Sequence, residues 1–134
     1  MRRKPAAVPS AGLGKTGRLR FNFAAKAYIF SSAAIAGDLA YVGDHNGKLY
    51  AIDIRSGKLA WEFQTPASQA DPMKVLNPDG SLRQEAFAPV FGDFEDMYLD
   101  FYRFISIGAI LSSPAVDRGV VYFGSMDGNV YALQ

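Results

Sequence analysis

The sequence offers few side chains that could perform chemistry on a ligand. Its single histidine, His45, lies in the turn-forming stretch Asp44-His45-Asn46-Gly47, and cysteine is absent. Without cysteine there is no disulfide, thiolate metal site or cysteine nucleophile. The similar stretch Ser125-Met126-Asp127-Gly128 lacks a histidine, which excludes a repeated histidine site. We therefore predict that His45 is an exposed turn residue and that the chain alone has no catalytic residue.

Acidic residues gather in a second candidate cluster. They are Asp93, Glu95, Asp96 and Asp100. Their spacing is not that of a calcium-binding loop. Acidic side chains in the first turn of a helix are stabilised by its dipole. We predict that these residues cap and solvate a helix, and that the chain has no metal-binding residue.

The stretch that follows Asp93 has helical periodicity. Apolar residues recur there at intervals of three and four, at Phe94, Met97, Tyr98, Phe101, Tyr102 and Ile105. This spacing predicts an amphipathic helix that begins after Asp93 and stops at Gly108. We expect the apolar stripe formed by Phe94, Met97, Tyr98 and Phe101 to pack on other parts of the same chain.

An internal repeat organises most of the remaining sequence. Ser31 aligns with Ser112 at an offset of 81 residues, and no gap is needed as far as Gln134. The identical pairs include Ser32/Ser113, Ala34/Ala115, Tyr41/Tyr122, Tyr50/Tyr131 and Ala51/Ala132. The conserved spacing of these residue types within one chain indicates two copies of one structural unit.

Each copy is predicted to form short antiparallel strands. In the first copy, residues 31–65, apolar stretches are separated by turns and give four strands: 31–35, 39–43, 49–54 and 59–64. The second copy, residues 111–134, has three. The turn residues shared by the copies are Gly43, Asn46, Gly47, Gly124, Asp127 and Gly128. Asn-Gly and Asp-Gly tolerate the positive φ angles of a tight hairpin.

Residues 51–61, Ala-Ile-Asp-Ile-Arg-Ser-Gly-Lys-Leu-Ala-Trp, resemble a motif of the quinoprotein β-propeller repeat family. This tryptophan-docking motif reads A-x-D-x-x-T-G-K-x-x-W. The matching residues here are Ala51, Asp53, Ser56, Gly57, Lys58 and Trp61, with Ser56 in the place of threonine. In the family, the tryptophan stacks between neighbouring blades. The resemblance therefore implies a structural role for Trp61.

The resemblance implies an all-β fold, a partial β-propeller of about two four-stranded antiparallel blades. We predict a flexible tail at 1–17 and a propeller-blade domain at 18–134. Within this domain we expect an outer strand at 18–23, a blade at 31–65, an insertion at 66–110 and a partial blade at 111–134. The alternating stretch Leu19–Phe23 either belongs to a preceding blade or completes the last sheet. The insertion is expected to hold a β-hairpin and the helix, and a degenerate blade is the alternative.

The family has both scaffold and enzyme members. The resemblance implies a non-catalytic binding or assembly scaffold similar to outer-membrane assembly propellers, or a fragment of a larger propeller. The alternative is a fragment of a quinone-dependent alcohol or sugar dehydrogenase, for which pyrroloquinoline quinone and calcium would be the cofactors. No cofactor is expected for this chain alone, because two blades cannot surround one.

Composition restricts the partners. The 134 residues are 49% hydrophobic and carry a formal net charge of +1, so electrostatics does not favour nucleic acid. No stretch is long and apolar enough to span a membrane. We expect a protein partner or further propeller blades, from the same chain in a longer gene or from a homo-oligomer. The family is mostly periplasmic or extracellular, but the sequence shows no clear signal peptide.

Overall fold

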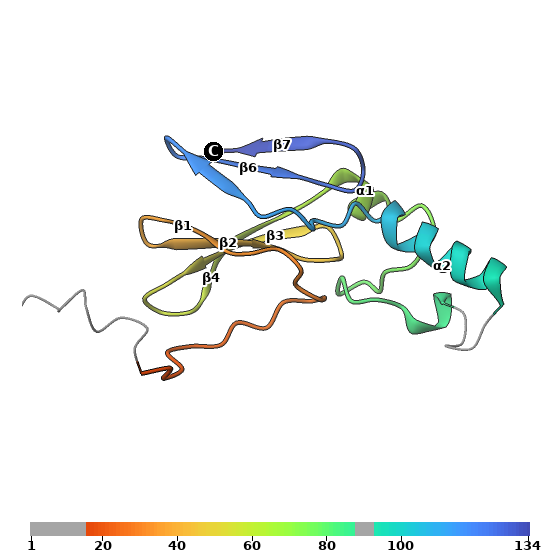
Figure 1. Cartoon of the computed structure of the whole chain (residues 1–134), viewed down its shortest axis with the longest axis horizontal. Coiled ribbons are helices and arrows are strands. Elements are labelled where there is room, and N and C mark those ends of the chain that lie inside the picture. Colours follow the sequence, from red (N-terminus) through yellow and green to blue (C-terminus); the bar gives the residue numbers. More distant parts are fainter. Residues whose placement is uncertain (1–15, 88–92) are drawn as a thin grey trace, which may run out of the picture.

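The computed structural model describes residues 16–87 and 93–134, and most of the predicted tail lies outside them. The strands form two antiparallel sheets (Figure 1). The first sheet contains β1 (Ala34–Ala36), β2 (Leu39–Gly43), β3 (Lys48–Asp53) and β4 (Leu59–Gln64), in that order. The second contains β5 (Ala115–Asp117), β6 (Val120–Gly124) and β7 (Val130–Leu133). The two sheets confirm the expected class of partial propeller blades.

The two sheets repeat each other in detail. The Ser31 hydroxyl donates to the carbonyl of Gly43 and accepts its N–H, both at 3.0 Å. Ser112 makes the same pair of hydrogen bonds with Gly124, both at 2.9 Å. The hairpin turns also agree, because Gly47 and Gly128 both have positive φ angles, which glycine adopts without strain. The sequence repeat is therefore a structural repeat.

The apolar core lies between the stacked sheets. Tyr41, Leu49 and Ala51 of the first sheet are buried against Val121 and Phe123 of the second. Ile110, from the segment that joins the sheets, and partly buried aromatic residues complete this core. Removal of this apolar surface from water is the main force that holds the two sheets together.

The sheets stack front to back. We call the face that carries Tyr41, Leu49 and Ala51 the front face of the first sheet. The front face of the second sheet carries the repeat equivalents of these residues. Successive side chains of a strand point to opposite faces, and Val121 and Phe123 correspond in the repeat to Ala40 and Val42. The second sheet therefore packs through its back face on the front face of the first.

The predicted outer strand at residues 18–23 is not a strand in the structure. Phe23 contacts the ring of Tyr50 at a centroid distance of 5.3 Å, and Phe21 lies against Gly57. Residues 18–23 thus lie behind the first sheet, on the side away from the second sheet, and contact its back face at Tyr50 (Figure 1). Of the two alternatives for this stretch, completion of the second sheet within the same chain is wrong, because the first sheet lies between them.

Residues 66–110, which we call the connecting segment, hold α1 (Pro66–Ala70), a 3₁₀ turn η2 (Gln84–Ala86) and α2 (Phe94–Ser106). The predicted hairpin is reduced to one bridge, Leu76 with Leu82. The predicted helix is confirmed, and the Asp93 side chain caps it by accepting the N–H of Asp96. A small second core forms where Val75, Leu76 and Ile107 meet.

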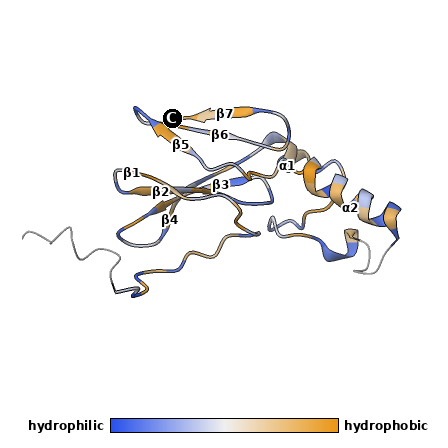
Figure 2. Cartoon of the chain, viewed as in Figure 1, coloured by the Kyte–Doolittle hydropathy of each residue, from blue (hydrophilic) through white to orange (hydrophobic). Residues whose placement is uncertain are grey.

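The apolar stripe of α2 does not pack as expected. Its members Phe94, Met97, Tyr98 and Phe101 are all exposed. The helix extends beyond the end of the sheets (Figure 1), and its apolar residues are visible along it in Figure 2. The last turns of α2 contact the rest of the protein, where the ring of Phe104 stacks on that of Phe87. Among the described residues, no helix is long and apolar enough to cross a membrane.

Candidate functional site

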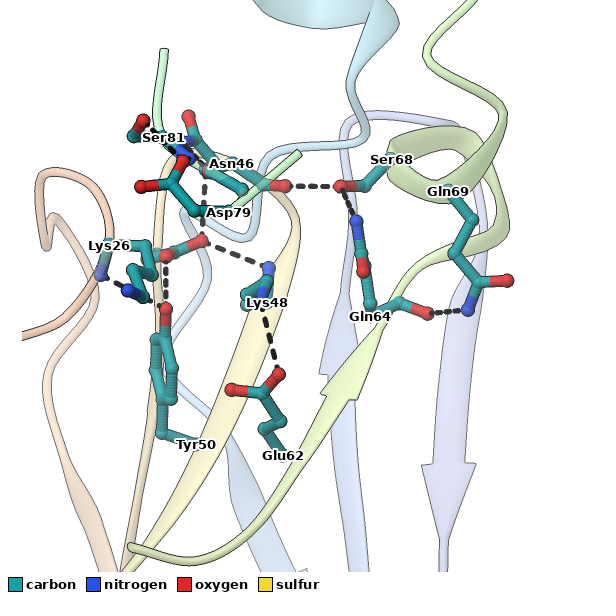
Figure 3. Close-up of polar contacts among 12 residues, drawn as sticks. Lys26, Asn46, Lys48, Tyr50, Glu62, Gln64, Ser68, Gln69, Asp79 and Ser81 are labelled. Atoms are coloured by element: carbon teal, nitrogen blue, oxygen red, sulfur yellow. Dashed lines mark hydrogen bonds and ion pairs between the residues drawn. The ribbon is translucent and has the colours of Figure 1, made fainter. Parts of the chain in front are cut away.

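The turn between β2 and β3 is built around a buried carboxylate. Asp44 Oδ1 accepts the main-chain N–H groups of Asn46 and Lys48, both at 2.9 Å. Its Oδ2 accepts the hydroxyl of Tyr50 at 2.7 Å. Burial raises the pKa of Asp44, although these hydrogen bonds act in the opposite direction. Tyr50 in turn accepts the main-chain N–H of Lys26, so the turn is tied to the segment behind the sheet (Figure 3).

His45 is partly buried, and the prediction of an exposed turn residue is wrong. Its ring lies between Phe30 and Phe104, at centroid distances of 5.6 and 4.8 Å. The connecting segment brings Phe104 to this turn, a long-range contact that local turn chemistry does not reveal. Burial lowers the pKa of His45, and the charge of Asp44 opposes this. Its Nδ1 is buried without a hydrogen-bond partner among the described residues.

The connecting segment also buries Asn46 and Gly47. The Asn46 amide donates to the carbonyl of Gly80 at 2.7 Å, and the Ser68 hydroxyl donates to the carbonyl of Asn46 at 2.6 Å. A Cβ atom on Gly47 would lie 2.6 Å from the carbonyl oxygen of Ile107. This glycine is needed for its φ of 78° and also for the close approach of the connecting segment.

The equivalent turn of the second sheet uses a different acid. The hydroxyl of Tyr131, the repeat equivalent of Tyr50, donates to Asp127, which is the equivalent of Asn46. The hydroxyl of Ser125, at the position of Asp44, donates to the carbonyl of Gly108. The tyrosine–aspartate pair is thus present in both copies, with the acid moved by two positions. A position-by-position alignment misses this pair.

The docking-motif residues form the turn between β3 and β4. Asp53 Oδ1 accepts the main-chain N–H groups of Arg55 and Ser56 and the Ser56 hydroxyl, at 2.8 to 3.0 Å. The N–H and the hydroxyl of Ser56 hold the pKa of Asp53 below its usual value. Gly57 has a φ of 70°, and the N–H of Lys58 bonds to the Ser56 hydroxyl. The motif residues Asp53, Ser56, Gly57 and Lys58 therefore stabilise the turn.

Trp61 lies opposite Ala51 in the β3–β4 register. Its ring is 5.8 Å from that of Tyr41, and the side chain remains 37% exposed. Docking of Trp61 between blades stays a prediction.

A polar cavity of about 450 Å³ lies between the first sheet, α1 and the stretch 76–83. Its lining includes Lys48, Gln64, Gln69, Asp71, Asp79 and Arg83. Several of these groups already have partners, since Lys48 forms a 3.0 Å ion pair with Glu62 and Gln64 donates to Ser68 (Figure 3). Both carboxylate oxygens of Asp71 accept main-chain N–H groups. In the parts of the chain that the structure describes, no group of three or more His, Cys, Asp or Glu side chains is placed to hold a metal ion.

Two repeat-related antiparallel sheets, stacked front to back, define a β-propeller repeat module. Residues 13–89 match the family described as outer membrane protein assembly factor BamB. The chain belongs to this family of quinoprotein-like propeller repeats. No curated protein matches the sequence.

Proposed function

We propose that the chain is a non-catalytic propeller scaffold that binds or assembles protein. The family description names an assembly factor, and we extend an assembly role to this chain. The observation that carries the proposal is the stacking of the two sheets through unlike faces. A front face that packs on the back face of another blade is a surface for assembly. The two sheets of this chain pack on each other through these two kinds of face.

The use of the acidic side chains supports a scaffold. Asp44, Asp53, Asp71, Asp79, Asp93 and Asp127 each accept at least one main-chain N–H group. Charge-assisted hydrogen bonds of this kind order turns and helix starts. A cofactor site needs acids that converge on one point with free oxygens. These six carboxylates instead order separate turns and helix ends, and two of them, Asp71 and Asp79, line the polar cavity.

A quinone-binding experiment distinguishes the scaffold proposal from the dehydrogenase alternative. The purified chain is titrated with pyrroloquinoline quinone and Ca²⁺ while absorbance and dye reduction are recorded, with an active quinone-dependent dehydrogenase as the positive control. We expect no saturable signal. Asp44→Asn should alter thermal stability and leave the dye signal at background. Saturable quinone binding with dye reduction would overturn the scaffold proposal.

A further inference from the structure

In the part of the chain that the structure describes, nothing covers the front face of the second sheet. Val130 is 78% exposed, whereas its repeat equivalent Leu49 is fully buried by the second sheet. Tyr122 and Ala132 beside it are exposed as well, whereas Tyr41 and Ala51 are buried. The same residue types thus occupy a core position in one copy and face water in the other. A contiguous apolar face of this kind marks an interaction site.

The back face of the first sheet has a complementary uncovered position. Ile35 is 68% exposed. Its repeat equivalent, Val116, packs into the core between the sheets. Val116 thus packs its back-face position on the front face of another sheet, whereas the equivalent position Ile35 has no such sheet against it among the described residues. Ile35 and Val130 lie on the two outer faces of the stack, one on each side.

The outer edge of β7 is also unpaired among the described residues. In the first sheet β3 pairs with β2 on one side and β4 on the other. Its equivalent β7 pairs only with β6 among the described residues. Phe21-Asn22-Phe23 has the apolar–polar–apolar order of Trp61-Glu62-Phe63 in β4, and no strand in residues 16–87 or 93–134 pairs with it. An unpaired edge with main-chain hydrogen-bonding groups is a template for another strand.

The position of residues 19–23 connects these observations. They lie one layer behind the first sheet, towards the turn between β3 and β4, where Phe21 contacts Gly57. If another chain placed its first sheet on the front face of the second sheet, its residues 19–23 would enter the layer of that second sheet. There they would lie beside the open edge of β7. A single second copy would therefore cover the exposed face and complete the sheet.

We propose that this chain associates head to tail with a second copy of itself. The back face of one copy, around Ile35, packs on the front face of the other, around Val130, and residues 19–23 of the first pair with β7 of the second. Such a heterologous contact closes into a ring or continues as a filament. This inference names a partner for the proposed scaffold function and rests on that function. The quinone titration tests the function independently.

The test measures the molar mass of the purified chain by light scattering between about 1 µM and about 1 mM, the range of weak to moderate affinities. We expect the mass to rise above that of a monomer. Val130→Lys and Ile35→Lys should each give a monomer, because each buries a charge in the contact. Phe94→Lys is the matched control, since Phe94 is 75% exposed but lies on α2. It should assemble like the unaltered chain.

A mixture of the two variants distinguishes a head-to-tail contact from a symmetric one. The Val130→Lys chain retains an intact back face, and the Ile35→Lys chain retains an intact front face. Their mixture should therefore form a dimer, although each alone is a monomer. A symmetric contact between two Val130 faces would not be restored by mixing. Circular dichroism confirms that each variant is folded.

A disulfide test locates the paired strands. The chain contains no cysteine, so introduced cysteines report only the designed contact. A Phe23→Cys chain mixed with a Val130→Cys chain should form a mixed disulfide on oxidation, whereas Phe94→Cys with Val130→Cys should not. Any one of five results would overturn the proposal. The unaltered chain could stay a monomer at every concentration, both lysine variants could still assemble, or Phe94→Lys could lose assembly. The mixture could also stay monomeric, or no mixed disulfide could form.

Discussion

Tyr50 donates a 2.7 Å hydrogen bond to the buried carboxylate of Asp44 and so closes the turn between β2 and β3. The second sheet contains the same pair of residue types in Tyr131 and Asp127, in a turn that is more exposed. Burial raises the pKa of Asp44. Burial also acts to raise the pKa of Asp127, but its hydrogen bonds outweigh this and bring the pKa below the usual value. The chain therefore contains the same tyrosine–aspartate hydrogen bond twice, once in a buried turn and once in a more exposed turn.

Tyr50→Phe should lower the free energy of unfolding by about 1–3 kcal/mol, because a buried oxygen of Asp44 loses its donor and the Lys26 N–H loses its acceptor. Tyr131→Phe is the matched control and should cost clearly less, since Asp127 can hydrogen-bond to water. Urea denaturation of both variants measures the difference. Equal losses would show that burial of the Asp44 turn adds nothing to this bond.

Gly43 is required for close packing of the connecting segment. A Cβ atom there would lie 2.6 Å from Cβ of Ile110, whereas at Gly124 the nearest atom is 3.6 Å away. Gly43→Ala should therefore destabilise the protein by about 1–3 kcal/mol through overpacking, and Gly124→Ala should cost little. Ile110→Ala should partly rescue Gly43→Ala in a double-mutant cycle. Purely additive losses would contradict the contact.

His45 should make stability depend on pH. Its pKa lies below the usual 6.5 in the folded chain, so the unfolded chain binds its proton more readily. The stabilising contribution is fully present above pH 6.5 and is lost as the pH falls through 6.5 towards the folded pKa. The melting temperature should fall in this window, and the fall should be reduced in His45→Gln. An unchanged pH profile in the variant would place the dependence elsewhere.

Asp53 should be important for the turn of the docking motif. Asp53→Ala removes the acceptor for two N–H groups and one hydroxyl, and it should lower the melting temperature. The pKa of Asp53 is lowered, so its contribution is present above the usual value of 3.8 and is lost as the pH falls through the folded pKa. The loss in the variant should therefore shrink in strong acid. Asp38→Ala, which removes only an exposed ion pair with Arg55, is the control.

Local sequence predicted the elements well. The turn glycines and alternating strands placed β2 and β4 at their observed bounds, and Asp93 marked the start of α2. The failures are long-range. Asn46 and Gly47 have the chemistry of an exposed hairpin, and only the return of the connecting segment buries them. The periodicity of α2 predicted its apolar stripe, but it could not predict that the helix extends away from the sheets and leaves this stripe exposed.

The connecting segment leaves the first sheet and returns at nearly the same place. Thr65 donates its N–H to the carbonyl of Gly47, and Ile110 donates its N–H to the carbonyl of Asp44 in the same turn. The segment also has a small core of its own around Val75 and Ile107. Because both ends of the segment join the first sheet at one turn, its length can change without moving the stacked sheets, provided that the residues that bury this turn, such as Ser68 and Gly80, are kept.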